Sequence, residues 1–195
     1  MQMRLFIAVE LDETVRAEAG RVVDILQRRA HTLAPRARLT WVTPERMHLT
    51  VRFIGAADDA RLGELHRVLE PTFEAARFSL SVQGTGAFPP KGPPRVVWAG
   101  LRDGRDRLLA LEREITARLS TIGIPAEDRP YSPHLTLGRV RDPAGLRSAA
   151  LLDGLQSHPF GETPIDAITL FESRLSPKGP SYVALSRRAL VDRRV

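Results

Sequence analysis

The stretch HLTV at residues 48–51 returns 86 positions later as HLTL at residues 134–137. A second short sequence repeats at nearly the same spacing, because PKGP at residues 90–93 recurs 87 positions later at residues 177–180. These two loops hold the only lysines of the chain. Two matched pairs at almost one offset predict an old internal duplication with one inserted residue.

The apolar pattern of the first half predicts strands alternating with helices. RLFIAVEL at residues 4–11 has the large apolar side chains of a strand, and the residues after it have apolar side chains at helical spacing. A loop rich in proline and glycine closes this half at residues 88–94. The expected strands are residues 4–11, 39–42, 47–54 and 78–82, and the expected helices are residues 13–30 and about 62–69.

The second half repeats this order of elements. RVVWAGL at residues 95–101 matches RLFIAVEL, and the helix, strand, helix and strand that follow come in the same sequence. The order predicts one α+β domain over residues 1–195, made of two pseudo-symmetric lobes whose equivalent motifs meet at a twofold axis. The expected strands are residues 95–101, 134–140, 165–171 and 182–185, and the expected helices are about residues 108–119 and 146–155.

Composition limits the classes of function. The chain of 195 residues has no cysteine, which excludes a disulfide, a thiolate nucleophile and a Cys-ligated metal. It shows no apolar run of membrane-spanning length and no cleavable signal pattern, so we expect a cytoplasmic protein with no membrane partner. The formal charge of +6 favours a polyanion such as RNA, although solvated arginines on helix faces explain it equally well.

The repeated motif places the same two kinds of side chain on each strand. Residues two apart on a strand share a face, so His48 lies beside Thr50 and His134 beside Thr136. Two imidazoles can supply the base and the acid that phosphodiester hydrolysis needs near neutral pH. Threonine hydroxyls can donate hydrogen bonds to the phosphate oxygens. The pattern therefore predicts a phosphate site between the two lobes.

A less specific interpretation applies to any single copy of the motif. A lone His-x-Thr on a strand is usually a half-buried structural position, and only the duplication at matched positions reverses that preference. Metal binding by the two motif histidines is disfavoured, because neither copy has a His, Asp or Glu two to four residues further on. The other histidines have no matched partner and are interpreted as surface or structural residues: His31, His66 and His158.

The paired motifs, RLFIAVEL, the stretch YSPHLTLGR at residues 131–139 and the order of elements resemble the 2H phosphoesterases. Among these the chain most resembles the RNA 2′,3′-cyclic phosphodiesterase family, also called the 2′-5′ RNA ligase family. The resemblance covers essentially the whole chain. It implies a bilobal α+β fold in which two antiparallel sheets face a central cleft and the helices lie outside.

The resemblance also implies roles for individual residues. His48 and His134 match the two catalytic histidines, with His48 taken as general acid and His134 as general base, an assignment that the pseudo-symmetry leaves reversible. Thr50 and Thr136 match the phosphate-binding hydroxyls. Arg139 matches a basic residue that contacts the phosphate or the nucleotide, and a bulge at Gly138 would be needed to aim it at the cleft.

The reaction implied by the resemblance is hydrolysis of an RNA or nucleotide 2′,3′-cyclic phosphate to a 2′-phosphate. No metal, nucleotide cofactor or covalent intermediate is expected. The implied partners are RNA ends, with tRNA halves among them, and the protein is expected to be a monomer. The reverse reaction would join RNA ends by a 2′-5′ linkage without ATP. Both lysines lie in PKGP, so there is no Lys-x-Asp-Gly adenylation motif.

Two alternatives stay open from the sequence. One is a phosphoesterase of the same superfamily with another substrate, such as an ADP-ribose cyclic phosphate or an oligoadenylate. The other is a non-catalytic module that binds RNA or nucleotides in the same cleft.

Several other residues near the motifs have two interpretations. Lys91 and Lys178 either attract the polynucleotide at the ends of the cleft or are simply turn residues, and the turn is favoured. Phe6, Trp98 and Tyr182 are expected to pack in the core rather than to stack on a base.

Overall fold

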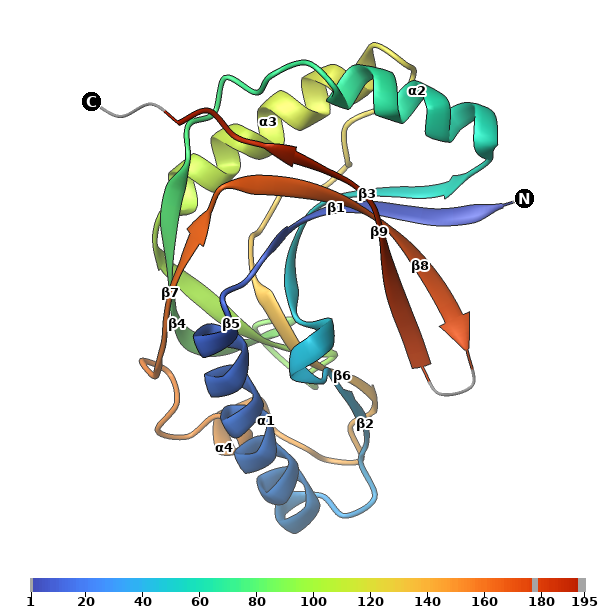
Figure 1. Ribbon diagram of the computed structural model, residues 1–195. Coiled ribbons are helices and arrows are strands. Elements are labelled where there is room, and N and C mark those ends of the chain that lie inside the picture. Colours follow the sequence, from blue (N-terminus) through green and yellow to red (C-terminus); the bar gives the residue numbers. More distant parts are fainter. Residues whose placement is uncertain (1, 177–178, 193–195) are drawn as a thin grey trace.

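The computed structural model describes residues 2–176 and 179–192, and in this part of the chain nine strands form two antiparallel sheets (Figure 1). Helices lie on the outer side of both sheets. The fold is therefore the α+β arrangement that the sequence predicted. Sheet A has the strand order β3 (His48–Ala57), β1 (Met3–Glu10), β8 (Ala167–Ser176), β9 (Gly179–Ala189). Sheet B has the order β2 (Arg38–Trp41), β6 (Leu135–Asp142), β5 (Val96–Asp103), β4 (Phe78–Phe88), β7 (Pro159–Ile165).

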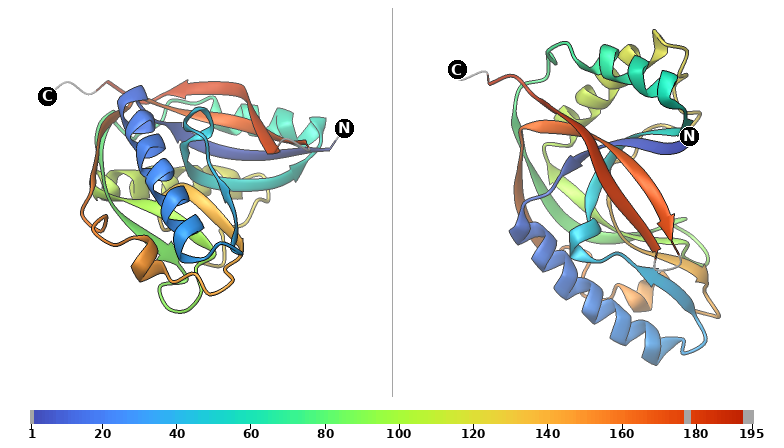
Figure 2. Two further views of the ribbon diagram at one scale, coloured as in Figure 1. Left: turned by 90° about the horizontal axis from the view of Figure 1, so that it is seen from below. Right: turned by 45° about the vertical axis from the view of Figure 1, so that its right-hand side comes forward.

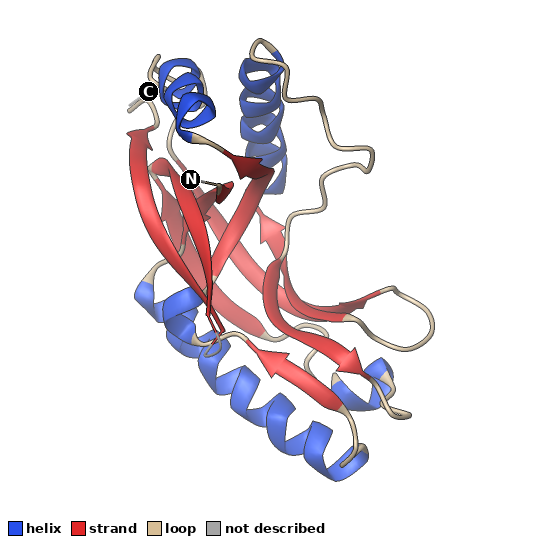
Figure 3. Cartoon of the chain, turned by 90° about the vertical axis from the view of Figure 1, so that its right-hand side faces the viewer, coloured by secondary structure: helices blue, strands red, loops and turns tan. Residues whose placement is uncertain are grey.

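The helices divide between the two sheets, and Figure 3 shows the strands between them. Helices α2 (Asp59–Leu69) and α3 (Arg105–Ser120) pack on sheet A, where both contact β3. Helix α1 (Glu13–Leu33) packs on sheet B, and the short α4 (Ser148–Leu151) packs on α1. A 3₁₀ turn, η1 (Pro44–Arg46), precedes β3. None of the helices in the described part of the chain is long and apolar enough to cross a membrane.

Helix α1 illustrates how the sequence positions these elements. Asp12 caps its first turn, since the Asp12 carboxylate accepts a hydrogen bond of 2.9 Å from the backbone N–H of Thr14. Six apolar residues at helical spacing form its buried stripe against sheet B. These residues are Val15, Ala19, Val22, Val23, Leu26 and Ala30.

The two halves of the chain exchange one strand each. Strand β4 closes the first half but pairs with β5 in sheet B, and β8 from the second half pairs with β1 in sheet A. As a result, β3-β1-β8 in one sheet corresponds to β6-β5-β4 in the other. In the two views of Figure 2, the sequence colouring lets the reader follow the chain as it passes from one sheet to the other. The motif strands β3 and β6 contact each other where the sheets meet.

Both motif strands have a bulge directly after the motif threonine. On β3, Thr50 pairs with Ala8 and Arg52 with Ile7, which leaves Val51 as an extra residue. On β6, the register passes from Thr136 directly to Gly138 opposite two adjacent residues of β5, which leaves Leu137 extra. Each bulge shifts the alternation of the residues that follow by one position. The expectation of a bulge next to Gly138 is thus confirmed.

Several sequence-based boundaries were wrong, and one is the end of the strand expected over 78–82, which extends to Phe88 as β4. The helix expected over 146–155 is only the single turn α4, because Gly145 and Gly154 adopt positive φ values of 88° and 70° that interrupt a helix on either side. The strand expected over 165–171 corresponds to β8, which begins at Ala167 and extends to Ser176, and the separate strand β7, which ends at Ile165, was not expected. The strand expected over 182–185 extends to the eleven residues of β9.

Candidate active site

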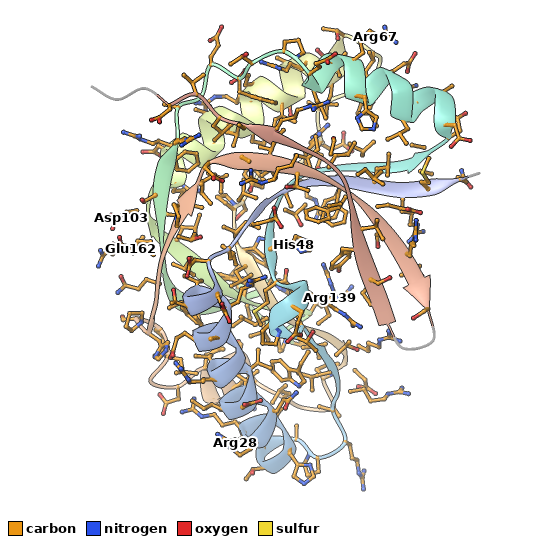
Figure 4. The ribbon with its side chains drawn as sticks, in the orientation of Figure 1. Arg28, His48, Arg67, Asp103, Arg139 and Glu162 are labelled. Atoms are coloured by element: carbon orange, nitrogen blue, oxygen red, sulfur yellow. The ribbon has the colours of Figure 1, made fainter. Side chains whose placement is uncertain are left out.

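A cleft of about 710 Å³ lies between the two sheets and contains all the site residues that the sequence indicated. Its walls come from all four strands of sheet A, from β4, β5 and β6 of sheet B, and from the two segments that lead into β3 and β6. Figure 4 shows His48 and Arg139 near the centre of the molecule, whereas Arg28 and Arg67 lie on the outer helices. The predicted residues that line the cleft are His48, Thr50, His134, Thr136 and Arg139.

The two imidazoles are held in the same way. The Nδ1 atom of His48 lies 2.9 Å from the carbonyl oxygen of Arg46, and the Nδ1 atom of His134 lies 2.7 Å from the carbonyl oxygen of Ser132. A carbonyl oxygen can only accept a hydrogen bond, so Nδ1 carries the proton in both rings. In the neutral state each Nε2 therefore presents a lone pair, and in the charged state an N–H.

Burial and nearby charges set the protonation of the two rings. Burial lowers the pKa of His48 below its ordinary value, while the Arg46 carbonyl and the Glu10 carboxylate act in the opposite direction. Burial also lowers the pKa of His134, and the positive charge of Arg139 lowers it further. The hydrogen bond to the Ser132 carbonyl acts in the opposite direction and raises this pKa. The nearby charges thus favour a protonated His48 and a neutral His134.

Aromatic side chains pack against both imidazole rings. Phe6 stacks on His48 with 4.9 Å between ring centroids, and Tyr182 meets the same imidazole edge-on at 4.9 Å. Phe88 meets His134 edge-on at 5.1 Å, and Trp98 packs on Phe88 with 5.2 Å between ring centroids. Tyr182 also lines the cleft. These contacts limit rotation of the imidazoles and exclude water from their faces.

The matched bulges place unlike residues at equivalent positions. Arg139 and Phe53 each lie five residues after a motif histidine, and both line the cleft. Arg52 points away from it and is 3% exposed. The phenyl ring of Phe53 is 58% exposed, although apolar side chains of this size are usually buried. Phe53 was missed from the sequence, although the equal spacing of five residues from each histidine was the available signal.

The remaining lining gives the cleft a positive charge. Four arginines and one glutamate contribute to its wall. Lys91 is exposed and is not part of that wall, and Lys178 lies outside the described residues. The charged residues of the wall are Arg4, Arg46, Arg129, Arg139 and Glu127.

The other histidines lie away from the cleft. The Nε2 atom of His158, the residue before β7, lies 2.9 Å from the Glu18 carboxylate on α1, which fits a structural role. His31 is exposed and His66 is half-buried on α2. Among residues 2–176 and 179–192, no group of three or more His, Asp or Glu side chains is arranged to hold a metal ion.

Comparison with known proteins places this geometry in a family. The model of the 2′-5′ RNA ligase superfamily matches residues 22–176. The chain belongs to this superfamily. Two proteins named RNA 2′,3′-cyclic phosphodiesterase are each 33% identical to it over 184 residues. The relative from Methanothermobacter thermautotrophicus matches over 93% of this chain and 96% of its own length. The relative from Thermotoga maritima matches over 94% and 93%.

Solved structures with the same fold exist. A crystal structure of a Thermus thermophilus protein superposes with a TM-score of 0.78 and 31% identity, over 98% of this chain and 100% of that one. The Escherichia coli LigT protein complexed with 3′-AMP superposes with a TM-score of 0.75 over 98% and 100%, at 24% identity. The fold inferred from the motifs is thus found in solved structures.

Proposed function

We propose that this protein hydrolyses the 2′,3′-cyclic phosphate of an RNA end or a nucleotide to a 2′-phosphate. The observation that carries the proposal is the pair of imidazoles in one cleft, each oriented by a carbonyl on Nδ1 so that Nε2 is available for proton transfer. The names of the relatives from M. thermautotrophicus and T. maritima support the same reaction.

The proposed reaction uses the two histidines as a base and an acid. Nε2 of neutral His134 takes a proton from water, whose oxygen attacks the phosphorus. The bond from phosphorus to the 3′ oxygen breaks, and this oxygen takes the proton from Nε2 of charged His48. The product keeps its phosphate on the 2′ oxygen. In reverse, with an RNA 5′-hydroxyl in place of the leaving water, the same groups would form a 2′-5′ linkage.

Three further side chains would stabilise the negative charge on the phosphate. The hydroxyls of Thr50 and Thr136 come from opposite walls of the cleft and can donate to the two non-bridging oxygens. Arg139 adds a positive charge on the side of His134. The exposed ring of Phe53 on the facing wall offers a surface on which a nucleobase can stack.

Nearby charges support the assignment of acid and base. Glu10 pairs with His48 across β1 and β3, and its carboxylate favours the charged imidazole that an acid requires. Arg139 favours the neutral imidazole that a base requires. The assignment can be tested with a substrate in which sulfur replaces the 3′ bridging oxygen, because a thiolate leaves without needing a proton. His48→Ala should recover most of its lost activity on this substrate, and His134→Ala should not.

The experiment that tests the function is hydrolysis of a short RNA with a terminal 2′,3′-cyclic phosphate in EDTA, followed by determination of the phosphate position. Wild type should release a 2′-phosphate, and His48→Ala and His134→Ala should each lose about 10²- to 10⁴-fold in kcat. RNA binding without turnover in the wild type would favour the binding module. Turnover only of an ADP-ribose cyclic phosphate or an oligoadenylate would favour the other substrate class.

A further inference from the structure

The segment that delivers His134 to the cleft has no regular secondary structure of its own. It runs over residues 121–134, from the end of α3 to the start of β6, and His134 is its last residue. Segments of this kind are mobile unless specific contacts hold them. A general base must stay within about 3 Å of the proton it takes. The geometry of His134 therefore depends on what anchors this segment.

Arg52 provides one anchor from the opposite motif strand. It follows Thr50 by two residues, and the bulge at Val51 turns it away from the cleft. Its guanidinium donates a hydrogen bond to the carbonyl oxygen of Pro125, and its Nη1 lies 3.6 Å from the carboxylate of Glu127. Since Arg52 is 3% exposed, this cation is buried among these partners.

Tyr131 provides a second anchor close to His134. Its hydroxyl donates a hydrogen bond of 2.8 Å to the carbonyl oxygen of Thr50. Burial raises the pKa of Tyr131 well above its ordinary value, so the phenol keeps its proton and remains a donor. The backbone N–H of Phe53 adds a longer contact of 3.4 Å to Glu127. All of these contacts join the segment before His134 to β3, the strand that carries His48.

The segment before His48 is held in the reciprocal way. Its strand β2 pairs with β6, and the backbone N–H of Val42 donates a hydrogen bond of 2.9 Å to the carbonyl oxygen of Leu137. Each motif strand therefore holds the segment that leads into the histidine of the other. The difference lies in the side chains, because the position matching Arg52 on β6 is Gly138. Of Arg52 and Gly138, only Arg52 has a guanidinium, and it anchors the segment that leads into His134.

We propose that Arg52 is a positioning residue, which fixes the segment 121–134 so that His134 stands opposite His48. Its effect on turnover rests on the proposed function, whereas its effect on the environment of His134 does not. The competing explanation is that Arg52 only stabilises the fold, since removing the hydrogen bonds of a buried side chain is destabilising in any protein. The test must therefore separate the state of His134 from overall stability.

The test is an NMR titration of the histidine C2 protons in wild type and in Arg52→Gln, with signals assigned through His48→Ala and His134→Ala. Burial lowers the pKa of His134, so a loosened segment that admits water should raise it toward the ordinary value. The pKa of His48 should stay unchanged. We expect kcat on the cyclic phosphate to fall about 10- to 100-fold, KM to change little, and Arg52→Lys to recover part of the loss.

Arg118→Gln is the matched control. Arg118 also donates to backbone carbonyls, those of Pro71 and Thr72, and pairs with Glu114, but the segment it holds has no site residue. Its loss should lower the melting temperature without moving the pKa of His134 or the kcat of the folded enzyme.

Two results would overturn the proposal. One is a folded Arg52→Gln protein in which the pKa of His134 and kcat both match wild type. The other is an equal shift of the pKa of His48 and His134, which would indicate general loosening. If Arg52→Gln does not fold, Tyr131→Phe removes the second anchor by deleting one oxygen and is judged by the same criteria. A wild type without cyclic phosphodiesterase activity would contradict the proposed function alone, because the titration still decides the positioning role.

Discussion

His48 and His134 each donate a hydrogen bond from Nδ1 to a backbone carbonyl, of Arg46 and Ser132 respectively, and this keeps the proton on Nδ1 in both neutral rings. The sequence predicted that these rings would meet, because the duplication and the alternation of strands place them on facing walls. It could not predict the carbonyl partners, because their position depends on how the chain turns just before each strand.

The lowered pKa values of both histidines predict the pH dependence of the reaction. At low pH both rings are charged and no base is present, and at high pH both are neutral and no acid is present. Since burial lowers both pKa values, kcat/KM should be bell-shaped with its maximum below the ordinary histidine pKa of about 6.5. Steady-state rates between pH 4 and 9 measure this profile, and a maximum above pH 7 would contradict it.

We expect the nucleobase of the substrate to stack on the exposed ring of Phe53. Phe53→Ala should weaken binding by about 1–3 kcal/mol through lost stacking, seen mainly as a raised KM. Phe53→Tyr, which keeps the ring face, should retain most of the binding. The comparison uses RNA ends that differ only in the terminal base, and an unchanged KM in Phe53→Ala would exclude stacking. Phe53 was not predictable from strand alternation, because only the bulge at Val51 turns it into the cleft.

Among the elements, strand β6 owes its shape to a glycine. A Cβ atom at Gly138 would lie 2.6 Å from the ring of Trp41 on the neighbouring strand, which is closer than atoms pack. Gly138→Ala should therefore push β2 away from β6, disturb the aim of Arg139 and cost about 1–3 kcal/mol of unfolding free energy. Denaturant unfolding and kcat measure the two effects.

Gly63→Ala is the control for this change. Gly63 lies in helix α2 with no atom within 4 Å of an added Cβ. The Gly63→Ala substitution should raise the free energy of unfolding by about 0.5–1 kcal/mol and leave kcat unchanged. If Gly138→Ala has the same free energy of unfolding as wild type, β2 can shift away from β6 without cost and the prediction is wrong.

The elements that the sequence missed are those whose form depends on distant contacts. Strand β7 contains Pro159 and Pro164, which are poor strand formers, and it forms because it adds to the edge of sheet B beside β4. Helix α4 is a single turn that packs on α1 rather than the longer helix that its apolar residues suggest. The amphipathic helices α1 and α3 were predicted well because their apolar stripes are long and regular.

At the scale of the whole molecule, the contact of α1 with β7 makes stability depend on pH. The hydrogen bond from His158, together with Arg21, lowers the pKa of Glu18, and this outweighs its partial burial. A lowered carboxyl pKa contributes stability that is present above the unfolded value of about 4.3 and is lost as the pH falls through the folded value. Glu18→Gln should be less stable than wild type at pH 7, and the difference should vanish toward pH 3.

Thermal unfolding of wild type, Glu18→Gln and His158→Ala across this range measures the effect. The double variant should lose less stability at pH 7 than the sum of the two single variants, because both single variants remove the same hydrogen bond between His158 and Glu18. A stability gap that stays constant from pH 7 to pH 3 would contradict the role of Glu18.

The exchange of β4 and β8 between the sheets means that neither half of the chain is a complete unit. A half chain alone would lack the strand that its sheet borrows from the other half, and β4 of the first half would have no partner. Two copies of an ancestral half could satisfy both needs by trading that strand. In such a homodimer each copy would contribute one histidine to a cleft on the symmetry axis. Fusion of the two copies would then have freed Phe53 and Arg139 to diverge, one toward a base and the other toward a phosphate.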